Sequence, residues 1–232
     1  FINANIQSDP ETLIKNGVLL IQDGKVLFAG EKTEVPKNAV VTDVKGKYIY
    51  PSFIDLYSDY GLPPVKAEHR EHRRPQMESN VKGAFGWNQA LRPNVDAHKL
   101  LVHNAEKAEE LRKSGFGTVL SHGKDGIVRG TGVLLNLNKT KENESIITDR
   151  AAAFYSFSKG TSTQDYPSSL VGSIALLRQT YYDAQWYAAS KTKTEYNISL
   201  EELSRLSNLP QIFEANDKYN ALRAAKIGSE FG

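Results

Sequence analysis

The pattern of apolar residues changes at Pro51, and this change constrains the fold more than any other feature of the chain. Before Pro51, two apolar runs flank Asp23-Gly24 in "GVLLIQDGKVLFAG". Both turn residues tolerate a positive φ, so the segment predicts a β-hairpin. "AVVTDVKGKYIYP" repeats the pattern around Gly46. We therefore expect residues 1–51 to form a small antiparallel β unit, which ends at Pro51 because proline lacks a backbone donor.

After Pro51, short apolar runs alternate with loops and helical patterns. The runs that predict strands are "SFIDLY", "FGTVLSH", "GIVRGTGVLLNL", "ESIITDRAAAFYSF" and "LPQIFEAND". Helices are predicted for "VDAHKLLVHNAEKAEELRKSG", for a segment that begins near Pro167, and for "KYNALRAAKIGSEFG". The alternation predicts an α/β fold with a parallel sheet and crossover helices over residues 52–232. Residues 62–98 are polar and contain scattered Pro and Gly, so we expect a long loop there.

The length of the chain limits what this sheet can be. A closed eight-stranded α/β barrel needs about 250 residues by itself, and this chain has 232 in all. A half-barrel would expose strand edges and an apolar interior. We therefore expect either an open sheet or a partner that completes it: the remainder of the same polypeptide, a second module, or a further copy of the chain.

Composition excludes several classes of function. The formal net charge of +2 provides no basic surplus for binding nucleic acid, and no apolar run approaches the roughly 20 residues of a transmembrane helix. The absence of cysteine excludes disulfides and thiolate zinc sites. It is typical of an exported bacterial protein, and the chain begins at Phe1 without a leader. We expect a periplasmic or secreted location with the signal peptide already removed; the cytoplasm is the alternative.

Three segments resemble the amidohydrolase superfamily. "LIKNGVLLIQDGKVLFAGEKTEVPKNAVVTDVKGKYIYPSFIDLYSDYG" resembles its amino-terminal signature, in which part of a β-sandwich leads into the first barrel strand and a Pro-Gly-hydrophobic-Ile-Asp-x-His-x-His motif. "LRKSGFGTVLSHGKDG" resembles the second barrel strand, and "LPQIFEANDKYNALRAAKIGSEFG" a later strand–helix unit of imidazolonepropionase-like members. The resemblance implies that residues 1–51 are a β-sandwich portion. Residues 52–232 would be the first half of a TIM-type (β/α)8 barrel.

The resemblance also implies a chemistry. Family members activate water on one or two divalent metals and hydrolyse amide or related C–N bonds. Two ligands separated by one residue on a strand point to the same side, which is why His-x-His forms half of a site. In this chain Tyr57 and Asp59 stand at those two positions, and Glu214 stands where relatives carry a later histidine. A phenol with a pKa of about 10 is a poor metal ligand, so we predict a degenerate metal motif.

The strand-end residues have more than one interpretation. We interpret Asp55, Tyr57 and Asp59 as a hydrogen-bonded strand end, in which the Asp55 carboxylate caps nearby backbone amides. The alternatives are catalysis by Asp55, Asp59 or Glu214, and an altered metal site made of Asp59, His122 and Glu214. His122 ends the second strand of the expected barrel and could face the same cavity.

Two other motifs have weaker functional meanings. His69 and His72 have the i, i+3 spacing with which two histidines on a helix can bind a metal, but we interpret them as part of a solvated charged loop. "GIVRGTG" lacks the Lys-Ser/Thr of a phosphate loop, so we interpret it as a turn.

The resemblance suggests the amino-terminal portion of a longer protein that hydrolyses C–N bonds in small-molecule amides. Zinc or another divalent metal would serve that parent protein, and we assign no cofactor to this chain itself. We expect the chain alone to be inactive. The hypothesis from a different class is a non-catalytic scaffold or binding module that docks onto a catalytic module through its exposed apolar surface.

Overall fold

The computed structural model describes the chain except for residues 67–74, 81–87, 140–141 and 191–195. Its described residues divide into two compact units, Phe1–Phe53 and Ile54–Gly232. No helix among the described residues is long and apolar enough to cross a membrane.

The first unit is a four-stranded sheet in the order β3-β2-β1-β4. Its strands are β1 (Ala4–Gln7), β2 (Leu13–Gln22), β3 (Lys25–Gly30) and β4 (Tyr48–Ile49). β2 and β3 pair antiparallel, and the turn between them has φ of 51° at Asp23 and 74° at Gly24, which confirms the predicted hairpin. The buried side chains of Ala4, Ile6 and Leu19 form its small core.

The second predicted hairpin is wrong. The turn exists, with positive φ at Lys45 and Gly46, but β4 pairs parallel with β1 rather than with the residues before the turn. The physical reason is that β1 offers a free edge on the side away from β2, and pairing there also places Ile49 against the small core. The unit is therefore not purely antiparallel.

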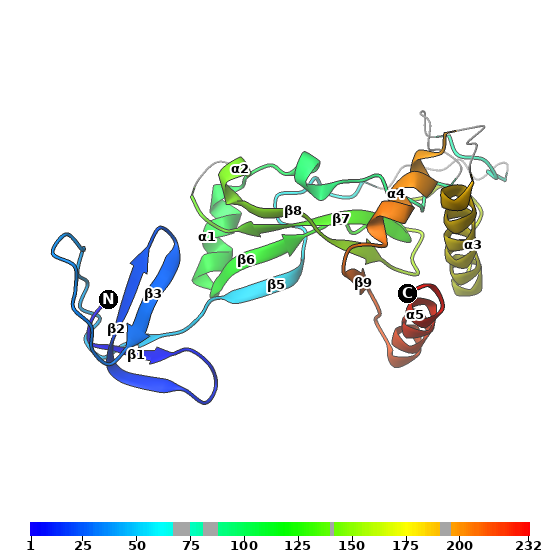
Figure 1. Ribbon diagram of the computed structural model, residues 1–232. Coiled ribbons are helices and arrows are strands. Elements are labelled where there is room, and N and C mark those ends of the chain that lie inside the picture. Colours follow the sequence, from blue (N-terminus) through cyan, green and yellow to red (C-terminus); the bar gives the residue numbers. More distant parts are fainter. Residues whose placement is uncertain (67–74, 81–87, 140–141, 191–195) are drawn as a thin grey trace. The chain divides into compact units, whose positions relative to one another are not determined.

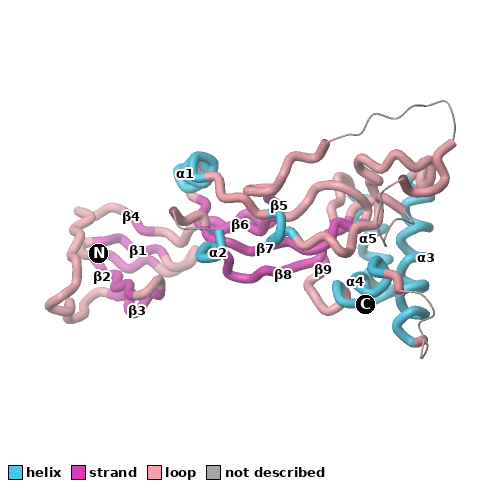
Figure 2. The backbone as a smooth tube through the Cα atoms, turned by 90° about the horizontal axis from the view of Figure 1, so that it is seen from above, coloured by secondary structure: helices cyan, strands magenta, loops and turns pink. Residues whose placement is uncertain are grey.

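The second unit is a five-stranded sheet in the order β5-β6-β7-β8-β9. Its strands are β5 (Phe53–Ser58), β6 (Phe116–Ser121), β7 (Val128–Asn136), β8 (Ile146–Tyr155) and β9 (Gln211–Phe213). Its helices are the 3-10 helix η1 (Ala97–Leu100), α1 (Ala105–Lys113), α2 (Glu142–Ser145), α3 (Leu170–Ala189), α4 (Ile198–Leu206) and α5 (Lys218–Phe231). α1 packs on one face of the sheet near β6, whereas α3, α4 and α5 gather beside β9 (Figures 1 and 2).

The prediction of an all-parallel sheet is correct for one strand pair and wrong for two. β8 and β9 are parallel and are joined through α3 and α4, as a crossover connection requires. β6–β7 and β7–β8, however, pair antiparallel. The segments that connect them, residues 122–127 and 137–145, are shorter than the dozen or so residues that a parallel crossover needs, which suits antiparallel neighbours. The fold is therefore mixed α/β.

The sheet is curled. β5 and β9 lie at opposite edges, four strand spacings apart, which would be roughly 19 Å in a flat sheet. Yet the hydroxyl of Tyr57 from β5 lies 2.6 Å from the carboxylate of Glu214, the residue after β9. Two side chains cannot together cover the flat distance, so the sheet must bend toward the face that carries them.

Both faces of the sheet are packed. Successive residues of β6 point to opposite sides. Val119 joins a cluster under α1 and η1 with Ala108 and Val133, while Leu120 joins Phe154 on the other face. The largest core lies between β8 and the last three helices and includes Leu177 of α3 and Leu203 of α4.

The helices largely follow the sequence prediction. α3 and α5 are where the pattern indicated, with Ser169 and Asp217 as their N-caps. The helix predicted across 95–115 is shorter, because η1 and an extended stretch precede α1, whose N-cap is Asn104. His98, within η1, and His103, just before α1, are half-buried.

Candidate functional site

Three side chains meet on the concave face, one from β5, one from β7 and one from the residue that follows β9. The hydroxyl of Tyr57 donates to Glu214 Oε2 at 2.6 Å, and Arg129 Nη1 lies 2.5 Å from the same oxygen. Arg129 Nη1 also lies 3.3 Å from the Tyr57 hydroxyl. We call these three residues the Tyr57–Arg129–Glu214 cluster. β7 is the central strand of the sheet, so its arginine lies between the two edge strands that carry its partners.

The cluster is an ion pair with a neutral phenol. Burial raises the pKa of Tyr57, and the hydrogen bond to Glu214 raises it further, so the hydroxyl stays a donor at neutral pH. Burial favours the neutral form of Glu214, but the bond from Tyr57 and the charge of Arg129 outweigh it, and the pKa of Glu214 is lowered. The side chain of Arg129 is only 5% exposed, and a buried charge of this kind requires such a partner.

The part that Arg129 plays in the cluster was not predicted from the sequence. Its motif, "GIVRGTG", is not a turn but runs into β7, and Gly130 adopts φ of 80° within that strand. A Cβ at Gly130 would lie 2.0 Å from the carbonyl oxygen of Val95, so glycine is required by close backbone approach. One signal was available: a lone arginine inside a predicted buried strand needs a carboxylate partner.

His122 lies next to the cluster as a buried neutral ring. It has no solvent exposure, stacks on Phe154 with ring centroids 3.6 Å apart, and lies 4.8 Å from the ring of Tyr57. Neither ring nitrogen has a hydrogen-bond partner among the described residues. Burial, and then the charges of Arg129 and Lys124, lower the pKa of His122 to about 3.

The two aspartates of the strand end do not join the cluster. Asp55 Oδ1 accepts the backbone N–H of Tyr57 at 2.9 Å, which is the local capping contact expected at this strand end. Asp59 points to solvent, with a side chain 72% exposed, and lies 3.5 Å from Lys124 Nζ. The structure thus brings together Tyr57 and Glu214 and leaves Asp59 apart from them.

The side chains of the Tyr57–Arg129–Glu214 cluster and their described neighbours do not fit a divalent metal. The described part of the chain holds no group of three or more His, Asp or Glu side chains that could bind one. The only carboxylate of the cluster is already paired with Arg129, whose charge would repel a second cation at this distance. His69 and His72 lie outside the described residues.

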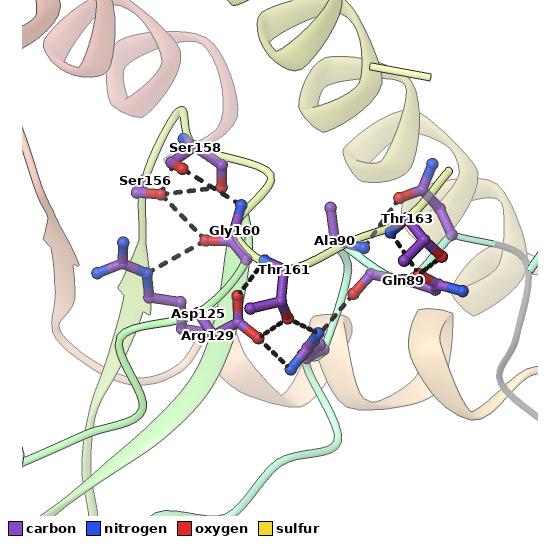
Figure 3. Close-up of polar contacts among 12 residues, drawn as sticks. Gln89, Ala90, Asp125, Arg129, Ser156, Ser158, Gly160, Thr161 and Thr163 are labelled. Carbon is purple, nitrogen blue, oxygen red and sulfur yellow. Dashed lines mark hydrogen bonds and ion pairs between the residues drawn. The ribbon is translucent and has the colours of Figure 1, made fainter. Parts of the chain in front are cut away.

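A second group of buried polar side chains ties three loops together (Figure 3). Asp125 accepts from the backbone N–H and the hydroxyl of Thr161 and pairs with Arg92 at 2.5 Å. Farther along, the side-chain oxygen of Gln89 accepts from Thr163. Gly160 has φ of 62°, and a Cβ there would lie 1.8 Å from Asp125 Oδ1, so this loop can close only over glycine.

Two cavities open beside these groups. One, of about 490 Å³, is lined by Asp55, Asp59, His103, Lys107 and Lys124 among others. The other, of about 310 Å³, has Arg92, Asp125, Arg129 and Thr161 in its wall. Of the cluster, the second cavity is lined by Arg129, which lies there beside Asp125 and Thr161 of the loop network in Figure 3.

Comparison with solved structures identifies the fold. The crystal structure of an amidohydrolase from Thermotoga maritima MSB8 matches this chain with a TM-score of 0.74 over 100% of its residues. The chain has the fold of part of an amidohydrolase. The two proteins are 24% identical, and the match spans 61% of the Thermotoga chain. No protein-family model matches the chain, and no curated protein does.

The similarity to this amidohydrolase agrees with the resemblance predicted from the hairpin and "YPSFID" segments. At this level of identity it establishes the fold.

Proposed function

We propose that this chain is the amino-terminal portion of an amidohydrolase-like protein that hydrolyses non-peptide C–N bonds of small-molecule amides. Its curled sheet would form the first half of a (β/α)8 barrel, with residues 1–51 as a β-sandwich portion and a periplasmic or secreted location. The fold similarity over the whole chain supports the kinship. The remainder of the polypeptide, or a second module, would complete the barrel.

The observation that carries the proposal for this portion is the Tyr57–Arg129–Glu214 cluster. Arg129 places a fixed positive charge where the resemblance implies metal ligands, and it is held by Glu214 at 2.5 Å. A fixed cation can orient and stabilise negative charge in a site that excludes water. A hydrolytic metal in the parent would therefore need ligands from residues outside this chain.

Metal analysis tests this assignment directly. Protein purified without chelator, offered zinc and then manganese, and dialysed, is expected to retain far less than one metal per chain by elemental analysis. A value near one would contradict the assignment. In that case Asp59→Asn combined with Glu214→Gln shows whether the altered site of Asp59, His122 and Glu214 is responsible, because it removes both carboxylates while nearly preserving shape.

The alternative, a non-catalytic scaffold or binding module, is favoured by one observation. β5 is an edge strand of the sheet, and its Ile54 and Leu56 are 57% and 60% exposed. An exposed apolar edge strand is a template for pairing with another chain. The occupant would be a strand of the missing barrel half or, for the isolated chain, a second copy.

This alternative predicts that the isolated chain self-associates at micromolar concentrations. Leu56→Lys is expected to shift the weight-average mass toward the monomer in sedimentation analysis, because a charge on an edge strand opposes pairing. Val171→Lys is the matched control, since Val171 is 75% exposed on α3, beside the opposite edge of the sheet from β5. A monodisperse monomer of the unmodified chain would contradict the scaffold hypothesis.

A further inference from the structure

Most of the charged side chains that line the cavity of about 310 Å³ are cationic. Three cationic side chains line it, namely Lys66, Arg92 and Arg129, against the single carboxylate of Asp125. Arg92 is neutralised by Asp125, 2.5 Å away. Arg129 is likewise paired with Glu214, so the net positive charge of the lining comes from Lys66 at the exposed rim.

Arg129 has donor capacity left over. Its Nε donates to the carbonyl of Gly126 at 3.1 Å, and its Nη1 contacts Tyr57 and Glu214. Within the described residues its Nη2 has no hydrogen-bond partner. Because Arg129 is almost fully buried and lines this cavity, the cavity is where a ligand oxygen could engage that donor.

The polar wall is held in place before any ligand arrives. Arg92 donates through Nε to the carbonyl of Gln89 at 2.9 Å and through Nη2 to Thr161, while Asp125 holds Thr161 (Figure 3). A wall fixed by such contacts loses little conformational freedom on binding.

Much of the rest of the lining is apolar, and the residues concerned are Leu62, Pro63, Pro64, Val65, Val95 and Leu100. A volume of this size suits a small organic molecule. Apolar and cationic sides together select a ligand with an apolar body and one negative end. Asp125 and the nearby Glu214 disfavour a doubly charged phosphate, because each further negative charge on the ligand would be repelled.

We propose that this cavity binds a small monoanionic carboxylate with an apolar body, whose carboxylate is held by Arg129 and Lys66. The inference needs binding alone and does not depend on hydrolysis by the parent protein.

Calorimetric titration of the chain with hippurate tests the proposal, with N-benzoylglycinamide as the uncharged probe of the same shape. Hippurate is expected to bind about tenfold more tightly or better, because hydrogen bonds to a charged group are the stronger ones. Arg129→Lys should weaken hippurate binding about tenfold, since lysine lacks the planar fork. Lys66→Gln should weaken it about threefold, as expected of an exposed charge.

Lys37→Gln is the control, because Lys37 is an exposed lysine of the first unit. Equal binding of hippurate and its amide would overturn the proposal, as would no detectable hippurate binding or tighter binding of inorganic phosphate. If Arg129→Lys fails to fold by circular dichroism, the Lys66→Gln titration and the ratio of the two probes still decide the matter.

Discussion

Replacing Arg129 with methionine is expected to lower the free energy of unfolding by about 3 kcal/mol. Methionine keeps much of the apolar stem but leaves the carboxylate of Glu214, whose side chain is 26% exposed, without its cation. Removing one partner of a buried ion pair is costly because the other charge stays desolvated. Chemical denaturation at pH 7 measures the loss.

The pair can be tested by a double-mutant cycle. Arg129→Met with Glu214→Gln is expected to be less destabilised than Arg129→Met alone, since no unpaired charge remains and the amide oxygen can still accept from Tyr57. Arg223→Met on α5 is the matched control and should change stability little, because Arg223 is exposed. A stability for Arg129→Met within about 0.5 kcal/mol of the unmodified chain would show that the cluster is not an energetic unit.

The second large effect is a loss of stability in mild acid caused by His122. Its pKa is about 3 in the folded chain and about 6.5 when unfolded. Between these values the unfolded state binds the extra proton, so stability falls as the pH drops from about 6.5 toward 3. Burial is the main cause, Arg129 and Lys124 add to it, and Glu214 and Asp59 oppose it. The contribution lost between pH 7 and pH 4 is about 3 kcal/mol.

The variant His122→Leu isolates this contribution. Protonation of carboxylates with a lowered pKa, such as Glu214, also destabilises the folded chain as the pH falls. The contribution of His122 is therefore measured as the difference in the free energy of unfolding between the unmodified chain and His122→Leu. We expect the unmodified chain to lose about 3 kcal/mol more than His122→Leu between pH 7 and pH 4, measured by denaturation at each pH. Parallel pH profiles would mean that His122 is protonated without penalty and that the ring is not sealed from water.

Part of the site was predictable from the sequence. The sequence placed Tyr57 near the end of the first barrel-like strand and Glu214 at the end of the later one, and both lie in the cluster. Asp59, expected to point to the same side as Tyr57, lies beyond β5 and apart from the cluster. The local resemblance was sufficient to place Tyr57 and Glu214. The contacts among Tyr57, Arg129 and Glu214 were not predictable. The Tyr57–Glu214 hydrogen bond joins residues 157 positions apart in the sequence, and the Tyr57–Arg129 contact joins residues 72 positions apart.

The direction of strand pairing was also outside the reach of local patterns. "GIVRGTGVLLNL" and "ESIITDRAAAFYSF" have the apolar character of buried strands, which fits a parallel sheet. They pair antiparallel and are still buried, since side chains pack on both faces of the sheet. Burial explains why these two strands are apolar, but their apolar composition does not reveal whether they pair parallel or antiparallel.

The sequence by itself determined the elements whose causes are local: the Asp23-Gly24 hairpin, the strand and helix over 211–231, and the long helix capped by Ser169. These depend on turn geometry, capping and periodicity within a few residues. Only the tertiary structure decided the curl of the sheet and, with it, the meeting of Tyr57, Arg129 and Glu214. The physical reason is that the partner of a buried charge such as Arg129 lies on another strand, far away in the sequence. The curvature that brings the two edges of the sheet together is a property of the whole sheet.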